Sequence, residues 1–200
     1  MPFYRVQFNF CPVCATKLEN IFLGGGLRKK CPQCNFIHWG NYALGVGGVV
    51  LQENKCLLVQ RAHNPGKGKW TIPGGYVNAD EKIEEAITRE VKEETGVIAE
   101  PLSVLAVRDR PEDNPSRRHD IYIVFLLQYL KGEIKPDPFE VLDCGFFTLE
   151  ECKRLDISSQ SYHSFLMALK YVQNGNPRPG LVRKQGLQLF GAQTEFYSLP

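Results

Sequence analysis

Apolar and polar positions form strand-like runs along much of the chain. From residue 42, the runs ALGVGGVVL and KCLLVQRA are separated by Gln52-Glu53-Asn54, a pattern typical of a β-hairpin. The Gly- and Pro-rich stretch NPGKGKWTIPGGYVN follows and is expected to be a loop. Further strands are predicted over residues 102–110, 121–130 and 141–147. The run at 121–130 is apolar on both faces, so we expect it to lie between two layers.

The most regular helical pattern covers residues 79–95. Asn78 or Asp80 can cap its first turn, and the spacing Asn78-x-x-Glu81 resembles a capping box. Gly96 is expected to end this helix, because glycine readily adopts the left-handed conformation found there.

Two more helices are expected towards the C-terminus. Thr148, with Glu151 three residues later, marks the start of one of them. The other is predicted over residues 159–173, with a core-facing stripe at helical spacing formed by Tyr162, Phe165, Leu166 and Leu169. Strands and helices in this order predict the α+β class.

Residues 1–40 have a different character. Short β-like runs at 3–10, 18–23 and 27–30 surround the glycine turn at 24–26. A segment of this size cannot bury enough apolar surface to hold itself together, so it needs a cross-link. We therefore expect a small module at 1–40, a main domain at 41–173 and a C-terminal tail at 174–200.

The composition indicates a packed core, and the charged residues are unevenly distributed along the chain. The 200 residues are 43% hydrophobic, and none of their apolar runs is long enough for a membrane-spanning helix. The N-terminus has no basic start followed by an apolar stretch, so a cytoplasmic location is expected. The net charge is only +2, but residues 1–40 carry five basic residues and one acidic residue. Residues 75–97 carry seven acids and three bases.

The seven cysteines fall into two groups. Cys56, Cys144 and Cys152 are scattered through apolar sequence and are expected to be buried, unreactive thiols. The other four form two CxxC pairs at zinc-ribbon spacing, and they are Cys11, Cys14, Cys31 and Cys34. Four thiolates on two tight turns complete a tetrahedral shell, which predicts a structural Zn²⁺. Two redox pairs are the alternative, and His38 is expected to be a surface or interface residue.

The acidic residues of the helix lie in line with its apolar face. At about 100° per residue, Glu90, Glu93 and Glu94 continue the stripe that Ile83, Ala86 and Ile87 begin. Carboxylates on a face that packs against a sheet require a cation, and clustered oxygen ligands suit Mg²⁺ or Mn²⁺. Arg89 lies four residues before Glu93 and can pair with it.

These residues carry a family resemblance. The segment Gly75-x5-Glu81-x7-Arg89-Glu90-Val91-x-Glu93-Glu94-x-Gly96-Val97 resembles the Nudix box at every specified position. The resemblance covers residues 42–173 and implies an α/β/α sandwich with a mixed β-sheet. The ribbon resembles that of the zinc-ribbon subgroup, which includes pyrophosphatases of NADH, ADP-ribose and FAD.

The resemblance also implies roles for single residues. The enzyme would be a Mg²⁺-dependent hydrolase of a nucleoside diphosphate linked to another group. Its metal ligands would be the carboxylates of Glu90, Glu93 and Glu94 and the backbone carbonyl of Gly75. Glu81 would bind the metal directly or would hold one of the other ligands. Arg89 would hold the glutamates in place. The general base would be a box glutamate or a later acid, for which Glu140 is the first candidate, with Glu133 and Asp137 as rivals.

The substrate is less well defined by the sequence. The candidate phosphate-contacting residues are Arg61, Lys69, Arg108 and Arg110. The stretch RDRPEDNPSRRHD stands where NADH pyrophosphatases carry a Ser-Gln-Pro-Trp-Pro-Phe-Pro-like motif, which favours ADP-ribose or FAD, with release of AMP. Two alternatives remain: an NADH or NAD-cap pyrophosphatase that removes caps from RNA, and a nucleic-acid-binding regulator that uses the basic module. A homodimer is expected from the resemblance, and RNA is not the favoured partner.

Overall fold

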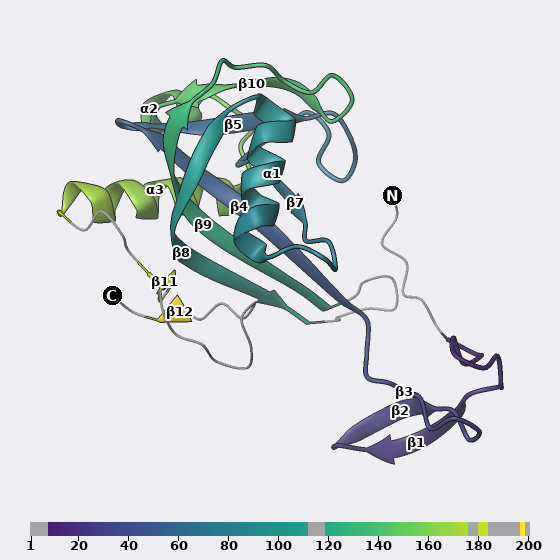
Figure 1. Cartoon of the computed structure of the whole chain (residues 1–200). Helices are drawn as coiled ribbons and strands as arrows, with labels where there is room; N and C mark the ends of the chain where they lie inside the picture. Colours follow the sequence, from purple (N-terminus) through teal and green to yellow (C-terminus); the bar gives the residue numbers. More distant parts are fainter. Residues whose placement is uncertain (1–7, 112–118, 176–179, 184–196, 199–200) are drawn as a thin grey trace. The chain divides into compact units, whose positions relative to one another are not determined.

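The computed structural model describes residues 8–111, 119–175, 180–183 and 197–198 (Figure 1). The chain forms two compact units. The smaller comprises Met1–Ala43 and Arg110–Asp120, and the larger comprises Leu44–Asp109 and Ile121–Pro200. The predicted boundary at residue 40 lies close to this division, but residues 110–120 join the smaller unit. Most of the predicted tail at 174–200 lies outside the described residues.

The smaller unit contains a three-stranded antiparallel sheet. Its strands are β1 (Glu19–Leu23), β2 (Gly26–Lys30) and β3 (Ile37–His38). Gly24 and Gly25 join β1 to β2, and both have positive φ values, 59° and 77°. Two such residues between paired strands match the hairpin turn that glycine favours.

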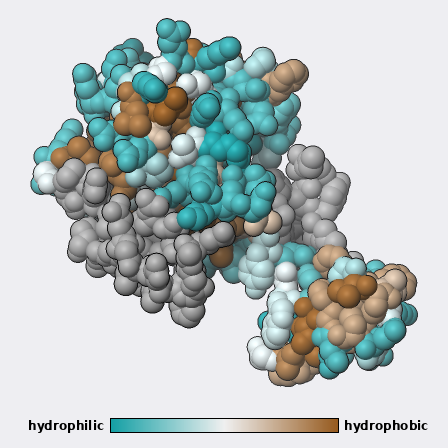
Figure 2. Space-filling model, in the orientation of Figure 1, coloured by the Kyte–Doolittle hydropathy of each residue, from teal (hydrophilic) through white to brown (hydrophobic). Residues whose placement is uncertain are grey.

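Two details of this unit differ from the expectation. Strand β3 was not foreseen, and among residues 8–10 only Phe10 takes part in a β-bridge, with Lys17. Residues 3–7 of the predicted first run lie outside the described part. Figure 2 shows apolar side chains on the surface of this unit. Among them, Phe22 and Leu27 are 78% and 67% exposed.

The larger unit is built on a sheet of seven strands in the order β10-β5-β4-β9-β8, with β6 paired to β5 and β7 to β4. These strands are β4 (Tyr42–Gln52), β5 (Lys55–Arg61), β6 (Trp70–Thr71), β7 (Gly74–Tyr76), β8 (Ile98–Arg110), β9 (His119–Lys131) and β10 (Val141–Phe147). The helices are α1 (Ile83–Thr95), α2 (Leu149–Cys152) and α3 (Ser159–Gln173), and the strands β11 (Val182–Arg183) and β12 (Tyr197–Ser198) form a separate pair. The predicted α+β class is confirmed.

Helices α1 and α3 cover opposite faces of this sheet (Figure 1). Phe125 and Leu127 of β9 pack with Ile87 and the rest of the α1 cluster. Val124 and Leu126, which alternate with them, pack with the α3 cluster. The prediction that residues 121–130 lie between two layers is confirmed, because successive residues of a strand point to opposite faces.

Helix α1 begins at Ile83, four residues later than predicted. The predicted cap at Asn78 or Asp80 is wrong, because the N-cap residue is Lys82. The Asn78 N–H does donate to the Glu81 carboxylate at 2.8 Å, but this turn closes before the helix starts. The carboxylate that serves the first helical turn belongs to Glu85, which accepts from the Lys82 N–H at 3.0 Å. Gly96 ends the helix with φ 75°, as predicted.

The stretch predicted as a loop contains the short strands β6 and β7. Two- and three-residue strands are too short to show a periodic pattern. Strand β7 brings Gly74 and Gly75 beside Gly47 and Val46 of β4, which places the start of the Nudix-like segment against the sheet.

The predicted stripe of α3 is wrong at Leu166, which is 43% exposed. The face that meets the sheet instead includes Ser161, whose hydroxyl accepts from the Ile72 N–H at 3.0 Å and contacts the Thr71 hydroxyl at 2.9 Å. A satisfied serine therefore occupies a core position that a purely apolar pattern cannot identify. No helix in the described part of the chain is long and apolar enough to cross a membrane.

The three scattered cysteines are buried, as predicted. Burial raises the pKa of Cys144 to about 11, and it also raises the pKa values of Cys56 and Cys152. A thiol with a raised pKa stays protonated and is a poor nucleophile.

We predict that these three thiols do not react with Ellman's reagent at pH 8 in the folded protein. The reaction should label no more than the four cysteines of the smaller unit, even when a chelator is present. Unfolding in guanidinium should expose all seven. Rapid labelling of more than four thiols in the folded protein would contradict this prediction.

Candidate functional site

Three carboxylates from two distant segments meet at one end of α1. Glu90 and Glu94 lie one turn apart on the helix, and Glu140 comes from the turn just before β10. Each offers an oxygen within 4.8 Å of the others. Glu90 and Glu94 are 9% and 8% exposed, whereas Glu140 is exposed. The cluster therefore has two buried acids and one that reaches solvent.

Backbone hydrogen bonds hold this arrangement. The Gly74 N–H donates to Oε2 of Glu94 at 2.9 Å, which fixes that carboxylate beside β7. The Asp137 N–H donates to the Glu94 carbonyl at 3.1 Å and ties the incoming loop to the helix end. The Asp137 carboxylate in turn accepts from the Phe139 and Glu140 N–H groups, which orders the turn that carries Glu140.

Of the three later acids considered for the general base, only Glu140 joins the cluster among the described residues, beside the box glutamates Glu90 and Glu94. The Asp137 carboxylate is occupied by its own turn. Glu133 lies in the loop that follows β9 and does not contribute to the group.

Arg89 connects four parts of the predicted motif, which are Glu81, Glu90, Glu93 and the backbone of Tyr76. It donates to both oxygens of Glu81, at 2.7 and 2.9 Å, to Glu90 at 2.8 Å and to the carbonyl of Tyr76 at 3.2 Å. The bonds from Arg89 lower the pKa of Glu81 to about 2. Glu81 therefore stays ionised as the partner of this arginine.

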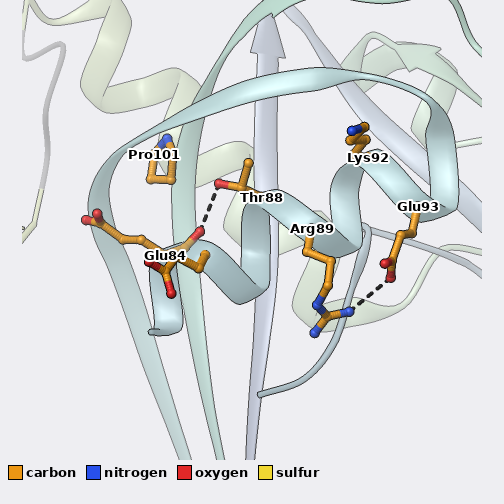
Figure 3. A pocket seen from close by; sticks show the side chains of 7 residues that line it. Glu84, Thr88, Arg89, Lys92, Glu93 and Pro101 are labelled. Atoms are coloured by element: carbon orange, nitrogen blue, oxygen red, sulfur yellow. Dashed lines mark hydrogen bonds and ion pairs between the residues drawn. The ribbon is translucent and has the colours of Figure 1, made fainter. Parts of the chain in front are cut away.

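Glu93 lies outside the carboxylate cluster. Its carboxylate accepts from Arg89 at 3.0 Å, and its side chain is 60% exposed. Together with Arg89 it borders a pocket of about 660 Å³ on the outer side of α1 (Figure 3). Of the three helix glutamates expected to converge, the structure brings only Glu90 and Glu94 together.

Gly75 is required by the close approach of Glu90. A β-carbon at this position would lie 2.5 Å from the Glu90 carboxylate. At the preceding residue, Gly74, a β-carbon would overlap the Val46 carbonyl. Any larger residue at either position would displace the strand or the acid.

The electrostatics of the cluster are unfavourable without a cation. Burial raises the pKa of Glu94 to about 8, the Gly74 hydrogen bond opposes this shift, and the charges of Glu90 and Glu140 add to it. Burial also raises the pKa of Glu90, and Arg89 offsets part of that shift. Clustered carboxylate oxygens that are partly desolvated form a donor set that suits a hard divalent cation. The residues present therefore fit such an ion.

A second cluster lies in the smaller unit, where four cysteine sulfurs meet. The Sγ of Cys14 is 3.4 Å from that of Cys31, and the Sγ of Cys11 is 3.5 Å from that of Cys34. The two CxxC turns have matching geometry: Ala15 and Asn35 each follow a pair with positive φ and donate an N–H to the carbonyl of Cys11 and Cys31, respectively. This donor set fits one tetrahedral Zn²⁺.

The four candidate phosphate-contacting residues have different environments. Arg61 lies near the cluster, since its charge lowers the pKa of Glu94. Lys69 pairs with Asp156 at 3.4 Å, and Arg110 pairs with Asp120 at 2.7 Å in the smaller unit. Arg108 lies over the ring of Tyr122, 4.8 Å from its centroid.

Sequence reasoning missed the Gly74 N–H that orients Glu94, and it did not single out Tyr122, whose hydroxyl lies next to Gly74. The glycine pair at 74–75 was the available signal for the first. No local signal pointed to Tyr122, because its contacts come from strands far apart in the chain.

Comparison with known proteins agrees with this geometry. Residues 41–167 match the model of the NUDIX domain. An ADP-ribose pyrophosphatase from Methanocaldococcus jannaschii is 42% identical over 113 residues, which cover 56% of this chain and 66% of that protein. The NAD-capped RNA hydrolase NudC from Vibrio vulnificus is 31% identical over 140 residues, which cover 70% of this chain and 51% of that protein. The chain thus spans about half to two thirds of these two relatives.

Among solved structures, a NUDIX hydrolase from Nitrosomonas europaea has a TM-score of 0.72 and 28% identity. The match covers 85% of this chain and 95% of that one. The matched domain spans more than half of the present chain and includes the whole acidic motif. The chain therefore belongs to the NUDIX family.

Proposed function

We propose that this protein is a divalent-metal-dependent pyrophosphatase that cleaves the diphosphate bond of a nucleoside diphosphate linked to another group. ADP-ribose or FAD is the proposed substrate, and AMP is one product. The observation that carries this proposal is the cluster of Glu90, Glu94 and Glu140, two of them buried, within 4.8 Å of one another.

The proposed metal ligands are Glu90 and Glu94, with the Gly75 carbonyl as a further oxygen and Glu93 and Glu81 as outer residues. A bound Mg²⁺ or Mn²⁺ would neutralise the diphosphate and lower the pKa of a coordinated water. The Gly74 N–H holds Glu94, and Arg89 holds Glu90, so both acids are oriented before substrate arrives. Preorganised charges of this kind supply most of the catalysis in phosphoryl transfer.

Glu140 is proposed as the proton acceptor. It is the exposed member of the cluster and the one that water can reach. The oxygen of the attacking water forms a bond to one phosphorus, the anhydride oxygen leaves with the other phosphoryl group, and the water proton passes to the Glu140 carboxylate. Arg61, which acts electrostatically on Glu94, is the best-placed candidate for contact with the phosphates.

We predict that purified protein with Mg²⁺ releases AMP and ribose 5-phosphate from ADP-ribose, or AMP and FMN from FAD. Chromatography of the products of ADP-ribose, FAD, NADH and an NAD-capped RNA would identify the substrate. Turnover should disappear when EDTA removes the metal and return when Mg²⁺ is added back. Failure to hydrolyse any member of this panel would contradict the proposal.

Decapping of NAD-capped RNA is the second candidate. It is supported by the NudC relative, by five basic residues against one acid at 1–40, and by exposed Phe22 and Leu27 on the smaller unit. Turnover of the capped RNA with a much lower KM than that of free NADH would favour this function. Salt-sensitive binding of RNA without turnover would favour the regulator instead.

We predict that Glu94→Gln lowers kcat by about 100-fold or more, because it removes a charged ligand from the proposed metal site. The amide oxygen can still accept from Gly74, so the melting temperature should stay within a few degrees of the wild-type value. Glu100→Gln is the matched control, since Glu100 is exposed on β8. Wild-type turnover by the Glu94 variant would refute the role assigned to this residue.

We also propose that the four cysteines of the smaller unit bind one structural Zn²⁺. This proposal rests on the matched CxxC turns and on the sulfur cluster.

We further propose that residues 1–40, 41–173 and 174–200 are the functional divisions of the chain, and that the protein is a cytoplasmic homodimer. The oligomeric state follows from the resemblance alone and can be measured by sedimentation.

Metal analysis is predicted to find about one zinc per chain. Cys31→Ser should lose the zinc, because it removes one of four thiolates. Cys144→Ser should keep it, since Cys144 is a buried cysteine of the larger unit. A folded, reduced sample without zinc would exclude the structural metal.

A further inference from the structure

Tyr122 lies where the sheet and the acidic site meet. Its ring covers two glycines of β4: a β-carbon on Gly45 would lie 2.7 Å from Cδ2 of the ring, and one on Gly47 would overlap the hydroxyl. The missing β-carbons therefore create the space that the ring fills. On strand β9, Tyr122 is followed by the buried residues Val124–Leu127, so its backbone is part of the rigid centre of the sheet.

The other side of the ring is also held. The Arg108 guanidinium lies over it, 4.8 Å from the ring centroid, and this guanidinium donates a hydrogen bond to the side chain of Gln160 on α3. A cation stacked on an aromatic face attracts it. The ring is thus held between the backbone of β4 and an arginine that a helix keeps in place.

In this arrangement the Tyr122 hydroxyl points toward Gly74. The hydroxyl oxygen lies 2.9 Å from the position that a β-carbon of Gly74 would occupy. Gly74 pairs with Gly47 in the β4–β7 ladder, and its own N–H donates to Glu94 at 2.9 Å. The only peptide seen to hold the Glu94 carboxylate, within the described ranges, is therefore packed against the tyrosine.

The electrostatic interaction between Tyr122 and Glu94 agrees with this arrangement. Burial raises the pKa of Tyr122 well above its usual value, and the charge of Glu94 raises it further. The phenol therefore stays neutral at physiological pH and adds no negative charge to the acidic cluster.

We infer that Tyr122 is a positioning residue for the acidic site: clamped between the Gly45–Gly47 face and Arg108, it fixes the Gly74 peptide and, through it, the Glu94 carboxylate. This inference rests on the proposed function for the meaning of the site, since it concerns the orientation of a metal ligand. It assigns Arg108 to the support of the site, in place of the direct phosphate contact that the sequence suggested.

The test is Mn²⁺ binding to the zinc-loaded, full-length protein, measured by electron paramagnetic resonance, together with steady-state kinetics. Tyr122→Phe removes a single oxygen and should raise the Kd for Mn²⁺ by about tenfold, the range typical of groups that orient a metal ligand. The value of kcat should fall with little change in KM. Tyr129→Phe is the matched control, because it makes the same change on the same strand, where the hydroxyl donates to the Gly132 carbonyl.

A double-mutant cycle separates this role from general packing. Gly47→Ala forces the ring away and should weaken Mn²⁺ binding in the wild-type background. The same substitution should have little further effect in a Tyr122→Leu protein, because the atoms it displaces are gone. Equal effects of Gly47→Ala in both backgrounds would overturn the inference.

The outcomes distinguish this inference from the proposed function. If wild type and Glu94→Gln bind Mn²⁺ equally, the proposed metal site itself is wrong. If Glu94→Gln loses binding while folded Tyr122→Phe keeps the wild-type Kd and kcat, only the role of Tyr122 is refuted.

Discussion

The acids of the site lie on the same helical stripe that packs α1 against the sheet. Ile87 and Val91 are fully buried, and Glu90 and Glu94 stand beside them, nearly as buried. Desolvating carboxylates in this way opposes folding unless hydrogen bonds and opposite charges compensate. Arg89 compensates Glu90 and the Gly74 N–H compensates Glu94, but only in part, as the raised pKa values of both acids show. A divalent cation, as proposed for this site, would offset the remaining imbalance.

The same constraint explains the glycines around the site. For two carboxylates to sit so close to the sheet, the strand beneath them has to approach without β-carbons. Gly75 leaves room for Glu90, Gly74 leaves room for the backbone of β4, and Gly47 leaves room for Tyr122. At Gly74 the backbone also has a positive φ of 155°, which residues with a side chain rarely adopt. At each position, the β-carbon of any other residue would push apart groups that pack closely around the acids.

The sequence predicted best those features whose causes are local. The bounds of α3 and β10 and the cap at Thr148 follow from residues within a few positions, and all three were located correctly. The start of α1 was misplaced because Glu81 completes its turn with Asn78 and then pairs with Arg89, eight residues on. Helical spacing predicted that Arg89 can pair with Glu93, and the structure contains this pair. The same spacing also placed Glu93 on the acidic stripe, and it did not show that Glu93 stays outside the cluster. Tyr122 could not be found at all, since only the sheet brings Gly45, Gly47 and Gly74 to one side chain.

Because Glu140 stands at the end of the loop between β9 and β10, its position beside Glu94 of α1 depends on how that loop is fastened. The loop is tied to the end of α1 through the Thr95 and Glu94 carbonyls, which accept from Lys135 and Asp137 at 2.8 and 3.1 Å. A cation shared by the helix and the turn would bind the folded protein and not the unfolded chain. It would therefore stabilise the fold, in addition to binding the substrate. In the proposed metal-bound state, a cation held by Glu90, Glu94 and Glu140 would add a link between α1 and the turn before β10, beyond the backbone hydrogen bonds that already join these segments. The same few carboxylate oxygens would then contribute both to the stability of the fold and to the geometry of the proposed site.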